Sequence, residues 1–91
     1  MPDHSEAHRR KRLLFQSTHR GTKEADLIIG GFAHAHMASM SSETFAAFEA
    51  LLAESDPDIM AWISEQEAPP QRHDNDVLKA IIQFKYALLN N

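Results

Sequence analysis

The spacing of the apolar residues constrains this chain more than any other feature. Apolar side chains recur three or four residues apart along most of the sequence, whereas no stretch of useful length alternates between apolar and polar residues. Pro69 and Pro70 fix two consecutive φ angles, so no helix is expected to cross them. The pattern predicts an all-α fold: one compact five-helix bundle that forms a single domain over residues 1–91, with residues 1–7 and 90–91 frayed.

The first two helices are expected to meet at a short turn. The first covers about residues 8–19, and Gly21 follows it at a place where helices often end with a positive φ. Thr22 is the expected N-cap of the second helix, because its hydroxyl can accept a backbone N–H. Gly30 and Gly31 lie in the middle of that helix and cost about 2 kcal/mol relative to alanines, so another helix is expected to approach closely there. The apolar residues expected to face inward are Leu13, Leu14, Phe15, Leu27, Ile28, Phe32 and Ala35.

The other three helices have recognisable start signals. Ser41 or Ser42 is the expected N-cap of the third. Asp56 followed by Pro57 predicts an N-cap and a first helical residue for the fourth. The fifth begins near residues 74–76. The apolar residues that share one face on these helices are Phe45, Phe48, Leu51, Leu52, Ile59, Trp62, Ile63, Val77, Leu78, Ile81, Ile82, Phe84 and Leu88.

Size and composition argue against an enzyme. A chain of 91 residues builds one modest core and leaves little volume for a large catalytic cleft. It contains no cysteine, so it has neither a disulfide nor a thiolate nucleophile. His34 and His36 lie two residues apart and point to nearly opposite sides of a helix, which disfavours a shared metal ion. We therefore expect no catalytic residues, no metal site and no permanently bound cofactor.

Charge and hydropathy limit the class of partner. The formal net charge is −4, which argues against nucleic acid, because proteins that bind it usually carry a positive face. The basic run at residues 8–12 is interpreted as a solvated helix face, with contact to nucleic acid or to an acidic partner surface as the alternatives. No apolar run approaches the roughly 20 residues of a membrane-spanning helix. The N-terminus lacks the apolar segment of a secretory signal. The sequence thus predicts no membrane insertion and a location in the bacterial cytoplasm.

The segment from His19 to Glu24 has two compatible interpretations. As a helix junction it needs only a glycine after one helix and a cap before the next. As a contact surface it places Arg20 and Glu24 together at an exposed corner, where Gly21 gives a partner's backbone close access. The planar guanidinium of Arg20 suits carboxylate or carbonyl groups. The residues alone leave both interpretations open.

Several short motifs together make the chain resemble a known family. Arg20-Gly21-x-x-Glu24 is followed by Asp26-Leu27 and Gly31-Phe32, then by Phe48-Glu49-x-Leu51-Leu52 and by Asp56-Pro57-Asp58-Ile59-x-x-Trp62-Ile63. In this combination, over about residues 12–78, the chain is similar to the succinate dehydrogenase flavinylation factors, called SdhE in bacteria and succinate dehydrogenase assembly factor 2 in mitochondria. His19 and Thr22 stand where many members carry Arg and Met.

The resemblance implies an assembly factor. It would bind the flavoprotein subunit of succinate dehydrogenase, with fumarate reductase as a second candidate, and promote covalent attachment of FAD. The FAD belongs to the partner, where its 8α-carbon is joined to a histidine. The partner-binding residues carried over are His19, Arg20, Gly21, Glu24 and Asp26, with Glu24 orienting Arg20 or contacting the flavin-binding domain. The factor itself is expected to be a monomer or a weak dimer. The alternative function is a regulatory interaction module of antitoxin type.

Overall fold

The computed structural model describes residues 5–90, which form five helices and no strand, as the apolar spacing predicts. The second helix is continuous over three segments, one of which is a π-helical turn. Two short 3₁₀ turns, η2 (Met37–Ser39) and η3 (Gln71–His73), lie between helices. The helices are α1 (Glu6–Ser17), the second helix of α2 (Lys23–Ala25), η1 (Asp26–Gly30) and α3 (Gly31–His36), then α4 (Ser42–Leu52), α5 (Asp56–Ile63) and α6 (Asp76–Leu89).

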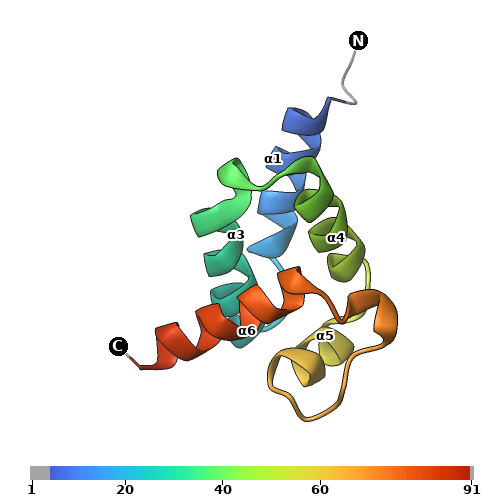
Figure 1. The fold of residues 1–91 in the computed structure, drawn as a ribbon. Coiled ribbons are helices and arrows are strands. Elements are labelled where there is room, and N and C mark those ends of the chain that lie inside the picture. Colours follow the sequence, from blue (N-terminus) through green and yellow to red (C-terminus); the bar gives the residue numbers. More distant parts are fainter. Residues whose placement is uncertain (1–4, 91) are drawn as a thin grey trace.

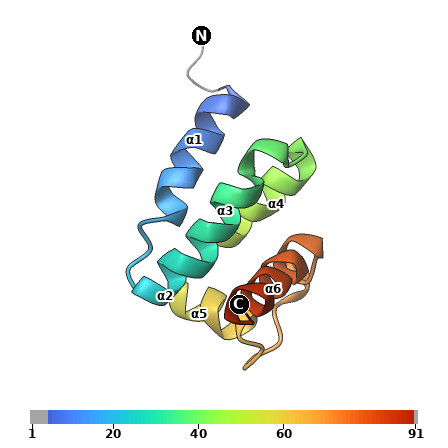
Figure 2. The same ribbon diagram turned by 90° about the vertical axis from the view of Figure 1, so that its left-hand side faces the viewer.

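The helices form two groups that share one core. Figure 2 shows α1, the second helix and α4 side by side, with α5 and α6 at the end where α2 begins. In Figure 1, α6 crosses that end and reaches both the second helix and α4. The N-terminal ends of the second helix and of α5 therefore lie at the same end of the molecule as the turn after α1.

Side-chain oxygens cap the helix starts. The hydroxyls of Thr22 and Ser41 accept the backbone N–H of the third residue along, which confirms Thr22 and selects Ser41 over Ser42. At α5 the predicted cap is wrong, because Ser55 rather than Asp56 accepts the N–H of Asp58. Asp56 is instead the first helical residue, and its carboxylate is released for another contact.

The first helix departs from its prediction in its bounds and in one face. Ser5 caps it at Glu6, and it ends at Ser17 rather than at residue 19. Phe15 was expected to turn inward, but its residue is 63% exposed. Leu13 and Ser17 lie one turn apart and form the inner face, so Phe15, midway between them, points to the opposite side. The expected fraying stays a prediction, and residues 1–4 and 91 lie outside the described residues.

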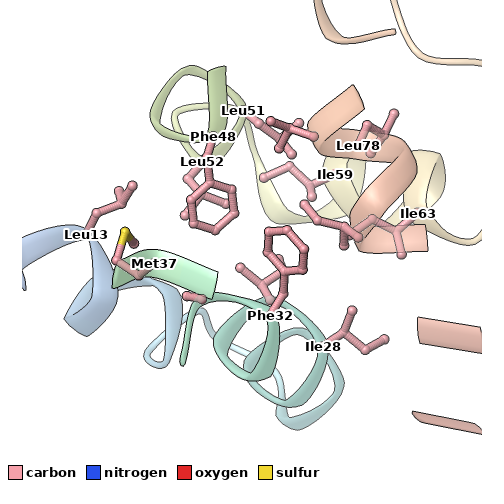
Figure 3. Close-up of a cluster of buried hydrophobic side chains, with 14 of the residues drawn as sticks. Leu13, Ile28, Phe32, Met37, Phe48, Leu51, Leu52, Ile59, Ile63 and Leu78 are labelled. Atoms are coloured by element: carbon pink, nitrogen blue, oxygen red, sulfur yellow. The ribbon is translucent and has the colours of Figure 1, made fainter. Parts of the chain in front are cut away.

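The core lies where the second helix meets α4 and α5. Figure 3 shows Phe32 of the second helix beside Phe48 of α4, and their ring centroids are 5.6 Å apart in an edge-to-face arrangement. Ile59 and Ile63 of α5 are fully buried on the same core. Leu27, also expected inside, is 58% exposed, and Ala35 is exposed as well. The remaining inward positions of the last three helices are buried or partly buried as predicted.

The glycine pair in the second helix permits close packing, as expected. A Cβ on Gly30 would lie 2.9 Å from the Thr18 side chain and 3.2 Å from the Ser17 carbonyl oxygen, so only glycine lets the end of α1 approach this helix. A Cβ on Gly31 would lie 3.1 Å from the ring of Phe84. Among residues 5–90 no helix is long and apolar enough to cross a bilayer.

Candidate functional site

The turn between α1 and the second helix, residues 18–22, is built around Arg20 and is called the Arg20 turn below. The guanidinium donates from Nε and Nη2 to Oδ1 of Asp56, at 2.9 and 2.7 Å. Nη2 also donates to the carbonyl oxygen of Leu52 at 3.2 Å. The side chain of Arg20 is 13% exposed and that of Asp56 is 25% exposed. The ion pair thus ties the turn to the first turn of α5, 36 residues away in sequence.

This pairing corrects the predicted corner. Arg20 and Glu24 do not orient each other, because the guanidinium bonds to Asp56 and, within residues 5–90, the Glu24 carboxylate makes no hydrogen bond or ion pair. Sequence reasoning missed Asp56 because it assigned that residue to the helix cap. The preceding Ser55 was the signal, since a second capping residue leaves the aspartate free for a distant cation. Its position in the first turn of α5 also suits negative charge.

Gly21 has a φ of +133°, a backbone conformation that residues with a Cβ rarely adopt. The expected positive φ is confirmed, although the residue lies within the loop and not directly after the helix, whose C-cap is Thr18. A Cβ at this position would lie 3.5 Å from Oδ2 of Asp56, which is an ordinary contact distance. The backbone conformation, and not a lack of space, therefore requires glycine in the Arg20 turn.

Asp26 of the second helix and the N-cap residue Thr22 also fix the turn. Oδ1 of Asp26 accepts the backbone N–H of Arg20 at 2.5 Å. The hydroxyl of Thr22 accepts the N–H of Ala25 at 3.1 Å and starts the helix. Arg20 is therefore held at its backbone by one carboxylate and at its side chain by another, from two different helices. Asp26 and Arg20, both predicted to bind a partner, make contacts within the chain.

His19, within the Arg20 turn, and Glu24, just after it, present polar atoms to solvent. His19 stacks on Phe15 with ring centroids 4.0 Å apart and an angle of 21° between the rings. Its Nδ1 lies 2.7 Å from the carbonyl oxygen of Phe15. Because a carbonyl oxygen only accepts, Nδ1 carries the proton, and the other ring nitrogen, Nε2, remains to face a partner. Glu24 is exposed. The surface formed by His19, Gly21 and Glu24 is called the docking surface below.

The basic run is not simply a solvated face. Arg10 donates to the carbonyl oxygens of Met37 and Met40, both at 2.6 Å, and pairs with Glu6. These carbonyls follow the end of the second helix, so Arg10 joins α1 to the segment before α4. Arg9 pairs with Glu49 of α4. The guanidinium groups of both arginines therefore bond to other parts of the chain, which weakens the nucleic-acid interpretation of the basic run.

A second polar cluster, which sequence reasoning missed, holds the loop before α6. Nε2 of the buried His73 lies 2.7 Å from Oε2 of Glu54, and Arg72 donates to the same oxygen. The hydrogen bond from His73 and then that from Arg72 lower the pKa of Glu54 below its ordinary value. His73 also packs against Trp62 with ring centroids 5.5 Å apart. The cluster is a structural clamp between the end of α4 and η3.

His34 and His36 of α3 belong to no group of metal-binding side chains among residues 5–90. Across residues 5–90, no three or more histidine, aspartate or glutamate side chains are grouped to hold a metal ion. His36 packs instead against Phe32, with ring centroids 4.7 Å apart, and lies near Phe84. What the described residues bring together at the Arg20 turn is charge, hydrogen-bonding groups and a glycine with a positive φ.

Comparison with known proteins gives consistent matches. Residues 11–85 match the family described as "Flavinator of succinate dehydrogenase". A protein of Candida glabrata named succinate dehydrogenase assembly factor 2, mitochondrial, is 36% identical over 80 residues, which cover 84% of this chain and 52% of that protein. A Dictyostelium discoideum protein of the same name is 36% identical over 72 residues, or 79% of this chain and 51% of that protein.

A bacterial protein matches over more of its own length. The protein of Acetobacter pasteurianus named FAD assembly factor SdhE is 34% identical over 77 residues, which cover 85% of this chain and 71% of that protein. This chain thus spans about half the length of the mitochondrial relatives above and nearly three quarters of the bacterial one.

Proposed function

This chain belongs to the family of flavinators of succinate dehydrogenase, and we propose that it is an assembly factor that binds the flavoprotein subunit and promotes covalent attachment of FAD to it. The family match over residues 11–85 is the observation that carries the proposal. The names of the relatives support it, since they describe assembly of succinate dehydrogenase and of its FAD. On the likeness to the bacterial relative, we place this activity in the cytoplasm.

The proposed mechanism is positioning and not catalysis by this chain. The reactive group is the flavin, and the residue that it joins belongs to the flavoprotein, so the chemistry is that of the cofactor and its host. A factor that binds one conformation of the flavoprotein more tightly shifts it towards that conformation. If the FAD and its acceptor are aligned there, attachment accelerates because fewer orientations must be searched. This role needs a rigid surface and no nucleophile.

We propose that the docking surface supplies this rigidity. Gly21 allows close approach of the partner's backbone, while His19 and Glu24 offer polar atoms that the chain itself leaves unused within residues 5–90. Arg20 and Asp26 support the docking surface indirectly, because their hydrogen bonds fix the backbone of the turn that carries it. A preorganised surface binds more tightly because less conformational freedom is lost on binding.

The first test is in-gel flavin fluorescence of denatured cell extract, with the gene deleted and then restored. Covalently bound flavin survives denaturation, so a fluorescent band at the size of the flavoprotein subunit should dim on deletion and return on restoration. Restoration with Gly21→Arg should fail, because the new side chain blocks the docking surface and strains a φ of +133°. Ala46→Arg, which places the same side chain at an exposed position of α4, should restore the band.

Two outcomes would contradict the proposal. An unchanged band in the deletion strain would show that attachment proceeds without this protein, and the antitoxin-type alternative would then take first place. Full restoration by Gly21→Arg would remove the docking surface from the mechanism. The melting temperature of purified Gly21→Arg protein separates the two possible causes of failure, because a folded variant that does not restore the band has lost contact and not structure.

A further inference from the structure

A groove adjoins the docking surface. It lies between the start of the second helix, one side of α5 and the far part of α6, and it has a volume of about 250 Å³. Glu24 belongs to both the docking surface and the groove, so the two are continuous. Six of the residues that line the groove are Glu24, Ile28, Pro57, Met60, Ile63 and Lys85.

Apolar side chains form part of the lining of the groove. Ile28 and Ile63 are buried, whereas Pro57 is exposed and Met60 is partly buried, so Pro57 and Met60 offer apolar surface to a partner. Such a surface suits an alkyl chain. Lysine and arginine side chains commonly lay their methylene groups along apolar surface while their charged ends reach a polar partner.

The two ionisable side chains in the lining have different roles. The ammonium of Lys85 donates to the carbonyl oxygen of Ile63 at 3.1 Å and lies 4.5 Å from the centre of the Tyr86 ring. That cation is therefore engaged at the C-terminal end of α5, where the helix dipole favours positive charge. Glu24, which also lines the groove, makes no side-chain hydrogen bond or ion pair within residues 5–90. The groove thus offers one carboxylate that a partner can neutralise.

The surroundings of Glu24 also favour a positive partner. The Arg20 turn brings the acids of the second helix and of α5 to one end of the molecule, since Arg20 contacts Asp26 and Asp56. The acidic residues at this end are Glu24, Asp26, Asp56 and Asp58, against the basic residues Arg20, Lys23 and Lys85. Arg20 is already paired, so the local field attracts a further cation.

We propose that this groove receives a lysine or arginine side chain of the flavoprotein, with its methylene groups on Pro57 and Met60 and its charge on Glu24. The proposal rests on the proposed function and specifies it: it gives the docking surface a contact of defined chemistry. It also explains why a surface on an acidic chain would select one region of a large partner, because a charge in an apolar groove fixes both position and orientation.

The test measures binding of the purified, FAD-free flavoprotein subunit to the full chain by calorimetry. Glu24→Gln keeps the shape of the side chain and removes its charge, and it should weaken binding about tenfold, the size expected for loss of one charge-assisted hydrogen bond. Glu24→Lys should weaken it further. Glu43→Gln is the matched control, because Glu43 is also an exposed acid in the first turn of a helix, α4, and lies outside the groove. Its affinity should equal that of the wild type.

A second pair of variants tests the groove itself. Gln66 is exposed and lines the groove, so Gln66→Trp should fill it and reduce affinity. Gln83→Trp adds the same side chain at an exposed position of α6 outside the groove and should bind normally. The difference between wild type and Glu24→Gln should also shrink as salt concentration rises, because ions screen the charge on an exposed carboxylate.

Each result bears on one of the two proposals. If the wild type does not bind the flavoprotein, the proposed function fails and the groove contact fails with it. If the wild type binds but Glu24→Gln and Gln66→Trp bind equally well, the groove contact is wrong and the proposed function stands. If Glu24→Gln weakens binding while Gln66→Trp does not, Glu24 acts at the open surface and the groove is not occupied.

Discussion

Removing the carboxylate of Asp56 should release Arg20 and loosen the turn that carries the docking surface. An exposed ion pair contributes about 0–1 kcal/mol to the free energy of unfolding, whereas breaking a fully buried pair costs about 3–5 kcal/mol. The Arg20–Asp56 pair lies between these limits, because both side chains are largely but not fully buried and one carboxylate oxygen accepts two N–H groups. We therefore expect Asp56→Asn to lower the free energy of unfolding by about 2 kcal/mol.

The assays are urea unfolding and thermal unfolding, each followed by circular dichroism. For a domain of this size, about 2 kcal/mol corresponds to a fall of about 10 °C in melting temperature, which is easily measured. Asp58→Asn is the matched control. Asp58 lies in the same first turn of α5, is exposed, and its side chain makes no hydrogen bond or ion pair within residues 5–90, so both variants lose a similar interaction with the helix dipole. Only Asp56→Asn also breaks the ion pair.

A double-mutant cycle with Arg20→Met decides what Arg20 does. If the guanidinium serves the turn through Asp56, the two substitutions should be coupled by at least about 1 kcal/mol. Binding of the flavoprotein should then be weakened by Arg20→Met in the wild type but little further in the Asp56→Asn background. Additive effects on stability would refute the ion pair as a stabilising contact. An equal loss of binding in both backgrounds would show that Arg20 contacts the flavoprotein directly.

Two further predictions concern the core and the acid limit of stability. Phe48→Ala should lower the free energy of unfolding by about 3–5 kcal/mol, because Phe48 of α4 is fully buried against Phe32 of the second helix; a nearly neutral effect in urea unfolding would show that this packing is wrong. The pKa of Glu54 is lowered by its hydrogen bonds from His73 and Arg72, so its stabilisation is present above the ordinary carboxyl pKa of 4.5 and is lost as the pH falls through the lowered value. The difference in unfolding midpoint between wild type and Glu54→Gln should therefore shrink below about pH 4.5, and a difference that does not change with pH would contradict the clamp.

Local patterns predict most of the fold. Thr22 and Ser41 cap helices because their hydroxyls satisfy backbone N–H groups a few residues away, and such a contact depends on nearby sequence alone. The burial of Phe32 and Phe48 follows from the same helical spacing that defines the elements. Phe15 shows the limit of this reasoning. Three consecutive apolar residues cannot all share one face, and the face is chosen by which neighbour packs against α1, which the spacing does not specify.

The site is harder to predict because its contacts are distant in sequence. The sequence motif singles out Arg20 and Glu24, which are four residues apart, but the guanidinium bonds to Asp56, 36 residues further along. No local pattern encodes that pairing, which depends on where α5 packs. The same holds for Arg10, whose bonds to the carbonyls of Met37 and Met40 require the end of the second helix to lie beside α1. Sequence identifies the residues that matter, and only the packing assigns their roles.

The π-helical turn at Asp26–Gly30 places a limit on how this family can vary in length. A π turn closes its hydrogen bond over one more residue than an α turn, so a single helix can direct Asp26 to the Arg20 turn and Phe32 to the core. Loss of one residue between them would rotate the preceding part by about 100° and carry Asp26 away from Arg20. We therefore expect insertions and deletions to be absent from this stretch in the family, even at positions such as the exposed Leu27 where the side chain can change.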